Sequence, residues 1–357
     1  MRVLEFAHLI AGPAAGLALA DLGADVLKVE RPGTGDVARG LGAMYQTWNG
    51  GKRSLAIDLH NHRERAVVAD LAAQADVVIE SFRPGVMDRL GLGYDAIRAV
   101  NPAVVYLSIS GFGEHERLRD RAGVDAVLQA ESGIMAQTGE PDGKPMRAGV
   151  QMIDGATGLA AGQAVLAALY ARTRHGRGDR ISLSLFDVAI YIQSHQFTEL
   201  SLTGRGPERT GNSVTYAYPV GLFETADGAV MISCYMPGHW ERLCAILHLD
   251  IAHDPRFATN ADRLARRDEL APLIEAAFRD RPTAEVLSAM LDAGLTAAKV
   301  ASYSDVAGGE AARFNQTFVD VGDHTVVRLP YQLAANPTVA RTAAPQLNAH
   351  ACVLPDL

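Results

Sequence analysis

An aspartate at the start of an apolar helix is the residue of this sequence best suited to covalent chemistry. Asp154 lies in the run Met-Ile-Asp-Gly-Ala-Thr-Gly (152–158), and the Ala- and Leu-rich segment 159–171 predicts a helix directly after it. An aspartate there can cap the helix by accepting a hydrogen bond from a backbone N–H. It can also be a nucleophilic carboxylate at the positive end of the helix dipole. Position alone leaves both roles open.

Basic side chains lie in or beside three glycine-containing loops of the predicted sheet domain: one at the end of a strand, one just before a strand, and one just after the loop 81–85. These are Arg31, Lys52 and Arg89. A guanidinium or ammonium beside glycines can approach a phosphate closely. Three such loops in one sheet domain predict a polyphosphate site, and Phe82 is placed to stack on a base or to pack in the core.

Redox cofactors and metals are not expected. The first strand–turn–helix unit carries Gly12 and Gly16 but lacks the middle glycine of the dinucleotide fingerprint, and Pro13 has no N–H to offer a pyrophosphate. The three cysteines show no paired metal spacing, and His60 and His62 have no third ligand near them in the sequence.

The elements that must position these residues alternate between strand and helix. Short β-branched runs predict strands, and amphipathic Ala- and Leu-rich runs predict helices. Such alternation indicates an α/β fold with a mostly parallel, Rossmann-like sheet, whose loops at the carboxyl ends of strands form one rim. Strands are expected at 3–6, 25–30, 54–58, 77–79, 103–109 and 181–185, and helices at 14–22, 62–74, 86–90 and 94–100.

The pattern changes near residue 205, where Gly, Arg and Pro become frequent. We expect a large domain over 1–204, a smaller α/β domain over 205–317, and a return to the large domain over 318–357. The smaller domain should contain a strand at 228–233 and helices at 240–247, 270–278 and 283–293, and the tail a strand at 325–329.

Composition is that of an ordinary globular chain. Hydrophobic residues make up 48% and charged residues 21%, and the net charge is −8. The acidic balance argues against broad nucleic-acid binding. No run approaches the roughly 18 apolar residues of a membrane span, and the N-terminus is not that of a signal peptide. Cysteines without a pairing pattern favour the reducing cytoplasm.

Several long motifs in order make the chain resemble the class III CoA-transferase family, of the formyl-CoA transferase and carnitine CoA-transferase type. They are HLIAGP (8–13), LGADVLKVERPGTGD (22–36), NGGKRSLAID (49–58), IESFRPGVMDRLG (79–91), the stretch 123–133, MIDGATG (152–158), GRGDRISLSLFD (176–187) and APQL (344–347) with His350.

The resemblance implies a covalent aspartyl intermediate on Asp154, with backbone N–H groups near its helix start holding the oxyanions. It implies that Arg31, Lys52 and Arg89 contact the phosphates of coenzyme A. Leu9, Ile10, Ala11 and Phe82 would surround the nucleotide and pantetheine. The substrates would be an acyl-CoA and a small carboxylic acid, with no metal and no redox cofactor. Two subunits would form an interlocked homodimer, and neither nucleic acid nor membrane would be a partner.

Some positions depart from the family pattern. Racemases of the same fold carry an acid/base histidine where this chain has Val124, and valine cannot carry a proton. Asp125 beside it could be a supporting acid or a helix cap. The glycine run of formyl-CoA transferase is replaced by bulky residues at 211–219, which argues against oxalate or formate. Tyr216 and Tyr218 could line the acid pocket or could serve packing.

The sequence predicts a CoA-transferase and does not identify its two acids. Arg147, Arg205 or Arg209 could bind a second carboxylate, or could be ordinary surface residues. The alternatives are a 2-methylacyl-CoA racemase, which would exchange an α-proton without an acceptor acid, and a non-catalytic CoA-binding protein.

Overall fold

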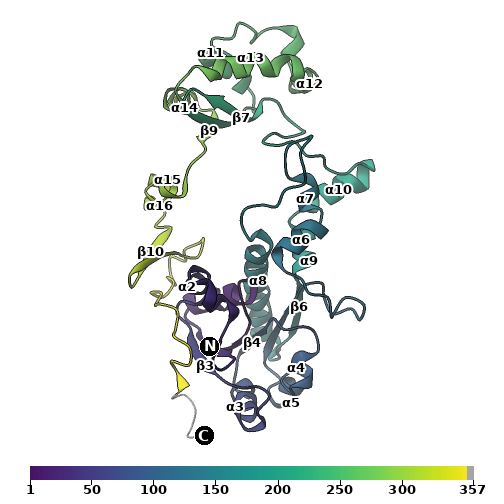
Figure 1. Ribbon diagram of the computed structural model, residues 1–357, viewed down its shortest axis with the longest axis vertical. Coiled ribbons are helices and arrows are strands. Elements are labelled where there is room, and N and C mark those ends of the chain that lie inside the picture. Colours follow the sequence, from purple (N-terminus) through teal and green to yellow (C-terminus); the bar gives the residue numbers. More distant parts are fainter. Residues whose placement is uncertain (352–357) are drawn as a thin grey trace. The chain divides into compact units, whose positions relative to one another are not determined.

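The computed structural model describes residues 1–351, and these fall into two compact units (Figure 1). The large unit holds residues 1–135, 147–207 and those from 313 onward, and the small unit holds residues 136–146 and 208–312. The chain enters the small unit after Pro207 and leaves it after Ala312, each within a few residues of the boundary expected from the sequence. The excursion of 136–146 into the small unit was not expected.

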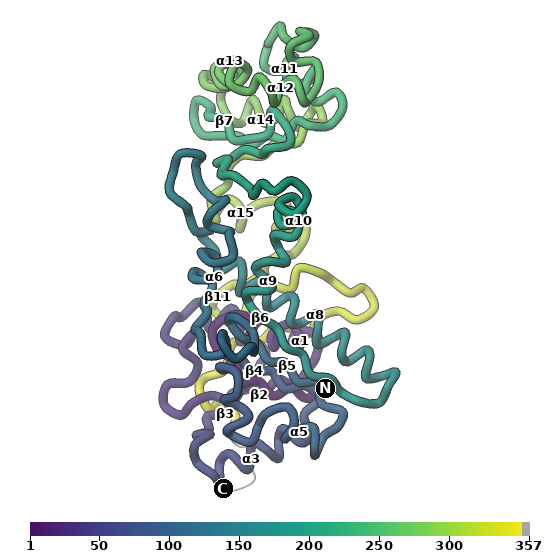
Figure 2. Tube along the Cα trace, turned by 90° about the vertical axis from the view of Figure 1, so that its right-hand side faces the viewer, coloured from purple at the N-terminus to yellow at the C-terminus, as the bar shows by residue number. Residues whose placement is uncertain are grey.

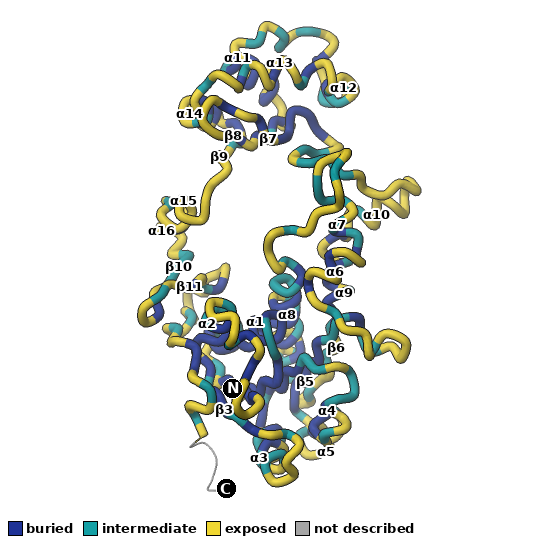
Figure 3. The backbone as a smooth tube through the Cα atoms, viewed as in Figure 1, coloured by how far each residue is buried: buried dark blue, intermediate teal, exposed yellow. Residues whose placement is uncertain are grey.

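A six-stranded parallel sheet forms the centre of the large unit, with strand order β3-β2-β1-β4-β5-β6. The strands are β1 (Arg2–Phe6), β2 (Asp25–Glu30), β3 (Arg53–Ala56), β4 (Val77–Glu80), β5 (Val105–Ser110) and β6 (Arg180–Ser184). The inner strands are buried on both faces, as Figure 3 shows in dark blue. Their near-continuous Val, Ile and Leu runs are typical of such strands.

Two helices that bear on the site pack together on one face of this sheet. They are α1 (Ala11–Asp21) and α8 (Met152–His175), which lie side by side in Figure 2. A Cβ added at Gly158 would stand 2.5 Å from the Cβ of Ala14, so glycine permits the close approach of the two helices. The opposite face is covered by α3 (His62–Ala73), α4 (Val86–Arg89) and α5 (Tyr94–Val100).

The remaining elements of the large unit surround this sheet. They are the 3₁₀ turn Val37–Leu41, α2 (Ala43–Asn49), α6 (Asp125–Glu131), α9 (Leu185–Tyr191), α10 (Ser194–Thr203) and the hairpin of β10 (Phe318–Val321) and β11 (His324–Val327). The C-terminal segment then runs along β3, where the N–H of His350 bonds to the carbonyl of Ser54 at 3.1 Å. Two short helices, α7 (Ile134–Gln137) and α16 (Glu310–Phe314), cross from one unit to the other.

The small unit is an antiparallel three-stranded sheet with helices packed on it. Its strands are β7 (Val220–Thr225), β8 (Gly228–Ser233) and β9 (Thr296–Lys299), and the packed helices are α11 (His239–Leu247), α12 (Asn260–Ala265), α13 (Arg267–Arg279) and α14 (Thr283–Asp292). The short helix α15 (Tyr303–Ala307) also belongs to this unit but buries no residue. Aromatic side chains fill its core, including Trp240, Phe257 and Phe278. The sequence had not assigned ranges to β7, β9 or α12.

One helix corrects the expectation drawn from hydropathy. By length and composition α8 could cross a membrane, with a mean hydropathy of 1.3 over its most apolar stretch. It is the only such helix among residues 1–351. Its small residues on the inner face, such as Ala161 and Val165, pack in the core beside α1 and the sheet, which is how a core helix of a globular domain packs.

Candidate active site

Asp154 lies in a pocket at the carboxyl ends of the parallel strands. It occupies the first turn of α8, is half-buried, and lines a cavity of about 250 Å³. The loops after β1, β4 and β5 supply most of the wall, which is where a parallel sheet presents its ligand site. The lining residues include Leu9, Ile10, Ala11, Gly12, Ser81, Phe82, Gly111 and Val124.

Asp154 does not cap its own helix, since no side chain of α8's first turn or N-cap does so. The cap comes from Asp125 at the start of α6, whose Oδ2 accepts the N–H of Ile153 at 2.8 Å and that of Asp154 at 3.2 Å. The carboxylate of Asp154 accepts no hydrogen bond from any residue in the described range 1–351. Its oxygens are therefore available to a ligand in the pocket.

The same contacts correct the expected source of oxyanion stabilisation. The N–H groups of Ile153 and Asp154 are taken by Asp125, and that of Gly155 bonds to the carbonyl of Gln151 at 3.0 Å. The start of α8 therefore has few donors left for an anionic oxygen.

A second helix end supplies donors in the same pocket. Ala11 and Gly12 open α1, and their N–H groups have no partner among the described residues, as is normal for the first turn of a helix. The positive end of the α1 dipole thus faces the cavity that holds Asp154, where it can stabilise negative charge on an oxygen.

The environment of Asp154 changes its acidity. Burial first, and then the negative charge of Asp125, raise the pKa of Asp154 to about 6. The carboxylate is still mostly ionised at neutral pH. The ionised carboxylate is less well solvated than that of a surface aspartate. Its conversion to an uncharged covalent adduct is therefore more favourable in free energy.

A larger cavity of about 1070 Å³ adjoins the Asp154 pocket, and His8 and Phe82 line both. Their rings meet edge to face, with centroids 5.6 Å apart. Arg31 and Arg89, two of the three cations expected to meet phosphates, line the larger cavity, and Arg65 joins them. Six of the seven expected binding residues, all but Lys52, line one or the other of these two neighbouring cavities.

Lys52 is the exception, and its assignment to the CoA phosphates is wrong in this structure. Its side chain is fully buried, and its ammonium donates to Glu5 at 2.8 Å, to the carbonyl of Pro13 at 2.8 Å and to Asn49 at 3.1 Å. Burial lowers the pKa of Lys52 to about 8, against the attraction of Glu5. With three acceptors already bound, the ammonium has no donor left for a phosphate.

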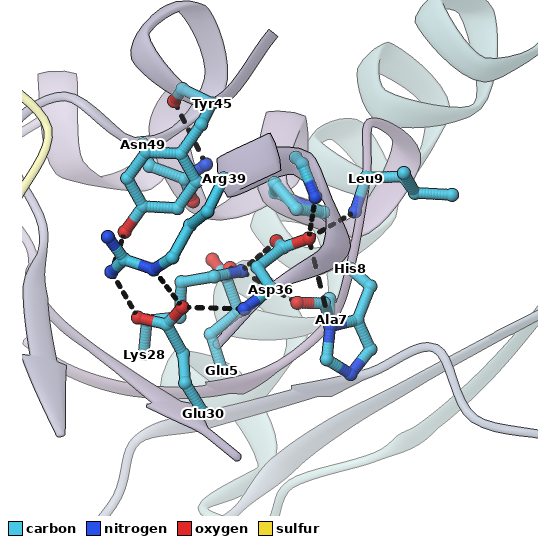
Figure 4. Close-up of polar contacts among 12 residues, drawn as sticks. Glu5, Ala7, His8, Leu9, Lys28, Glu30, Asp36, Arg39, Tyr45 and Asn49 are labelled. Carbon is cyan, nitrogen blue, oxygen red and sulfur yellow. Dashed lines mark hydrogen bonds and ion pairs between the residues drawn. The ribbon is translucent and has the colours of Figure 1, made fainter. Parts of the chain in front are cut away.

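Lys52 belongs instead to a buried charge cluster, which we define as Glu5, Lys28, Glu30, Asp36, Arg39 and Lys52 (Figure 4 labels all but Lys52). Lys28 bonds to Glu5 at 2.8 Å and to Asp36 at 2.9 Å, with all three side chains out of contact with solvent. Three acids face three bases, so the cluster has no net formal charge. This balance is what makes such burial tolerable.

The cluster fixes the loop that enters the active site. The Oδ1 atom of Asp36 accepts the N–H of Leu9 at 3.1 Å, and Leu9 adopts a left-handed φ of 64° that leucine normally avoids. Burial would raise the pKa of Asp36, but hydrogen bonds and the charge of Lys28 outweigh it and hold that pKa below its usual range. Asp36 therefore stays an anion and holds Leu9 at the pocket wall.

The other expected residues fall into three groups. Val124 lines the Asp154 pocket, so the position of the racemase histidine is occupied by an apolar side chain. Tyr218 is buried and Tyr216 is exposed within the small unit. Arg209 donates to the carbonyls of Ala136, Glu140 and Pro141, which is a structural role, and Arg147 and Arg205 are exposed. Within the large unit, neither Arg147 nor Arg205 lines the Asp154 pocket.

Comparison with known proteins decides the family. The sequence profile of CoA-transferase family III matches residues 1–351. The chain belongs to CoA-transferase family III. It is accordingly a transferase that uses acyl-CoA, and within residues 1–351 no group of three His, Cys, Asp or Glu residues could hold a metal ion.

Two known CoA-transferases are similar to this chain over most of their length. The succinate–glutarate CoA-transferase of Agrobacterium fabrum is 36% identical, over 98% of this chain and 92% of its own. The acetyl-CoA:oxalate CoA-transferase of Acetobacter aceti is 37% identical, over 89% of this chain and 82% of its own. Among solved structures, a CaiB/BaiF family protein from Brucella suis superimposes with a TM-score of 0.91 at 34% identity, covering 99% of this chain and 97% of its own.

Proposed function

We propose that this family III enzyme moves CoA from an acyl-CoA to a free carboxylic acid through a covalent intermediate on Asp154. The observation that carries the proposal is the free carboxylate of Asp154 in a pocket that also contains the unpaired N–H groups of α1. The adjoining cavity with Arg31, Phe82 and Arg89 is proposed to take the nucleotide end of CoA.

The exchange runs in four balanced steps. An Oδ atom of Asp154 bonds to the thioester carbon, and the CoA thiolate leaves with the electron pair, which gives a mixed anhydride. The thiolate then attacks the aspartyl carbonyl, forming an aspartyl thioester and releasing the first carboxylate. The incoming carboxylate attacks that thioester and expels the thiolate again. Finally the thiolate attacks the new acyl carbon, which frees the new acyl-CoA and restores the Asp154 carboxylate.

The structure supports distinct tasks for the surrounding groups. The N–H groups of Ala11 and Gly12 would stabilise the oxyanion of each tetrahedral intermediate. The raised pKa of Asp154 matches a nucleophile whose charge disappears on acylation. Val124 offers no second proton carrier, so α-proton exchange of the racemase kind has no acid/base pair at this position.

The test is the intact mass of the protein after incubation with separate acyl-CoAs, including succinyl-CoA, acetyl-CoA and a long-chain acyl-CoA. We expect a mass increase in the wild type that hydroxylamine removes, and none in Asp154→Ala. The donor that gives the adduct is then offered succinate, glutarate, oxalate and a fatty acid, and product acyl-CoA is measured. Binding of CoA without an adduct from any donor would refute the covalent mechanism, and α-proton exchange in deuterated water would then identify a racemase.

We further propose that the enzyme is a homodimer with interlocked subunits. The outer face of α8 carries Leu159, Leu166 and Tyr170, all exposed, and α10 adds Phe197 and Leu200. Exposed apolar side chains of this kind on helices of one unit are typical of an interface. Native mass spectrometry should give twice the 38.0 kDa chain mass, and a monomer at micromolar concentration would contradict the proposal.

A cytoplasmic location is proposed as well. Cys234 and Cys244 are free, buried thiols, which a reducing compartment preserves. Cell fractionation with a compartment marker tests this, and recovery with secreted or membrane proteins would contradict it.

A further inference from the structure

We infer that Asp125 and Gln129, on helix α6, are positioning residues that hold the nucleophilic turn of α8 in place. Asp125 is 5% exposed and Gln129 is fully buried. Neither was assigned a catalytic or binding role by the sequence, which left Asp125 between a cap and a supporting acid. The inference rests on the proposed function of Asp154.

The contacts form a clamp with two arms, which we call the α6 clamp. One arm is the Oδ2 atom of Asp125, which binds the N–H groups of Ile153 and Asp154. The other arm is the amide of Gln129, whose Oε1 accepts the N–H of Ala148 at 2.9 Å and whose Nε2 donates to the carbonyl of Val150 at 3.3 Å. The clamp therefore holds the backbone of the segment 148–154 at both of its ends.

The two arms are joined to each other. The Nε2 atom of Gln129 donates to Oδ1 of Asp125 at 2.6 Å, one helical turn apart on α6. Each carboxylate oxygen of Asp125 therefore has a fixed partner, and the side chain cannot rotate without breaking a buried hydrogen bond. A catalytic carboxylate on a clamped turn keeps its direction, which matters because a displacement of about 1 Å can cost roughly 100-fold in rate.

The clamp also acts through charge. The anion of Asp125 lies beside the nucleophile and opposes its ionisation, and this repulsion is relieved when Asp154 becomes an anhydride or a thioester. The other titratable or charged side chains that line the pocket are His8, Arg83, Arg119 and Arg121. Within residues 1–351, none of them bonds to the backbone of the turn. Among these charged residues, Asp125 alone both bonds to the backbone of the turn and raises the pKa of Asp154.

Substitution can separate the two effects. In Asp125→Asn one amide group must face either the N–H of Ile153 or the Nε2 of Gln129, so two donors oppose each other at hydrogen-bond distance. A second change, Gln129→Glu, supplies an acceptor for the new amide and keeps the acceptor for Ala148. It keeps the total charge, but it replaces the longer bond to Val150 by a contact between two acceptors, the introduced carboxylate and the carbonyl of Val150. Ser132→Ala is the matched control, because Ser132 lies at the end of α6, is buried, and its hydroxyl has no partner in the described part of the chain.

The experiment measures steady-state CoA transfer across pH for these variants, each checked for folding by circular dichroism. In Asp125→Asn we expect kcat to fall about tenfold or more, with the KM for acyl-CoA changed less than about twofold. The acid limb of the rate profile should move to lower pH. Asp125→Asn with Gln129→Glu should recover part of the kcat, and Ser132→Ala should match the wild type. If Asp125→Asn does not fold, Gln129→Met tests the second arm alone and should also lower kcat.

A readout that needs no turnover distinguishes this inference from the proposed function. The side-chain ¹³C resonance of Asp154, identified by its loss in Asp154→Asn, should titrate at lower pH in Asp125→Asn than in the wild type. If the wild type shows no CoA transfer but the titration of Asp154 still shifts in Asp125→Asn, the proposed function is overturned and the clamp stands. Unchanged kcat, unchanged acid limb and unchanged titration in a folded Asp125→Asn enzyme would overturn the clamp.

Discussion

Replacing the nucleophile should make the protein more stable, and the gain should depend on pH. Asp154→Asn keeps the shape of the side chain and cannot carry a negative charge. The pKa of Asp154 rises from 3.8 to about 6 on folding, chiefly through burial. The folded protein therefore binds this proton more tightly than the unfolded chain, and the ionised carboxylate lowers stability at pH values above its folded pKa.

The size of the effect follows from the two pKa values. A difference of one between the folded and unfolded pKa corresponds to about 1.4 kcal/mol, so the full penalty is about 3 kcal/mol near pH 7.5. Near pH 4.5, below the folded pKa, the same linkage leaves only about 1 kcal/mol. The asparagine variant avoids the penalty, so its stabilisation should shrink by about 2 kcal/mol between the two pH values.

Urea unfolding followed by far-ultraviolet circular dichroism measures this at equal protein concentration. Asp70→Asn on the exposed side of α3 is the matched control and should leave the midpoint unchanged at both pH values. The reasoning is refuted if Asp154→Asn is no more stable than the wild type at pH 7.5. A gain of the same size at both pH values would also refute it, because the cause would then be packing instead of charge.

Two further changes probe the cation sites. Lys52→Met leaves Glu5 without one of its two buried partners. The free energy of unfolding, measured by urea titration, should therefore fall by about 3–5 kcal/mol. An unchanged midpoint would contradict the buried position of Lys52. Arg89→Ala should raise the KM for acyl-CoA by roughly tenfold or more with kcat little changed, because a charge-assisted bond to phosphate is lost. The control Arg98→Ala, on α5, should have no effect on either constant. Equal effects of the two substitutions would contradict a specific contact of Arg89 with phosphate.

Most of the large unit's sheet could be predicted from the sequence. Strands β2 and β8 begin and end at the predicted residues, because each is an apolar or alternating run closed by glycine or by charge. Helix α8 begins two residues earlier than Asp154. The sequence could not show this, because the carboxylate that caps the helix is Asp125, which lies on another helix.

Lys52 shows why the site could be predicted only in part. Its basic side chain beside glycines matched the phosphate pattern as well as Arg31 does. What distinguishes the two is Glu5, the one charged residue in the buried part of its strand, which is paired in register with Lys28. A charge inside each of two buried neighbouring strands was the available signal, but pairing is a tertiary contact, and the order of the strands is needed to see it.

The buried charge cluster has a consequence for how this protein can change over generations. Loss of any one member leaves the buried cluster with an unbalanced charge, so most single substitutions there are expected to be severe. A neutral replacement requires at least one acid and one base to change together. Lineages that descend from this chain should therefore keep or exchange these residues as paired sets, while the half-exposed walls of the larger cavity can vary one residue at a time.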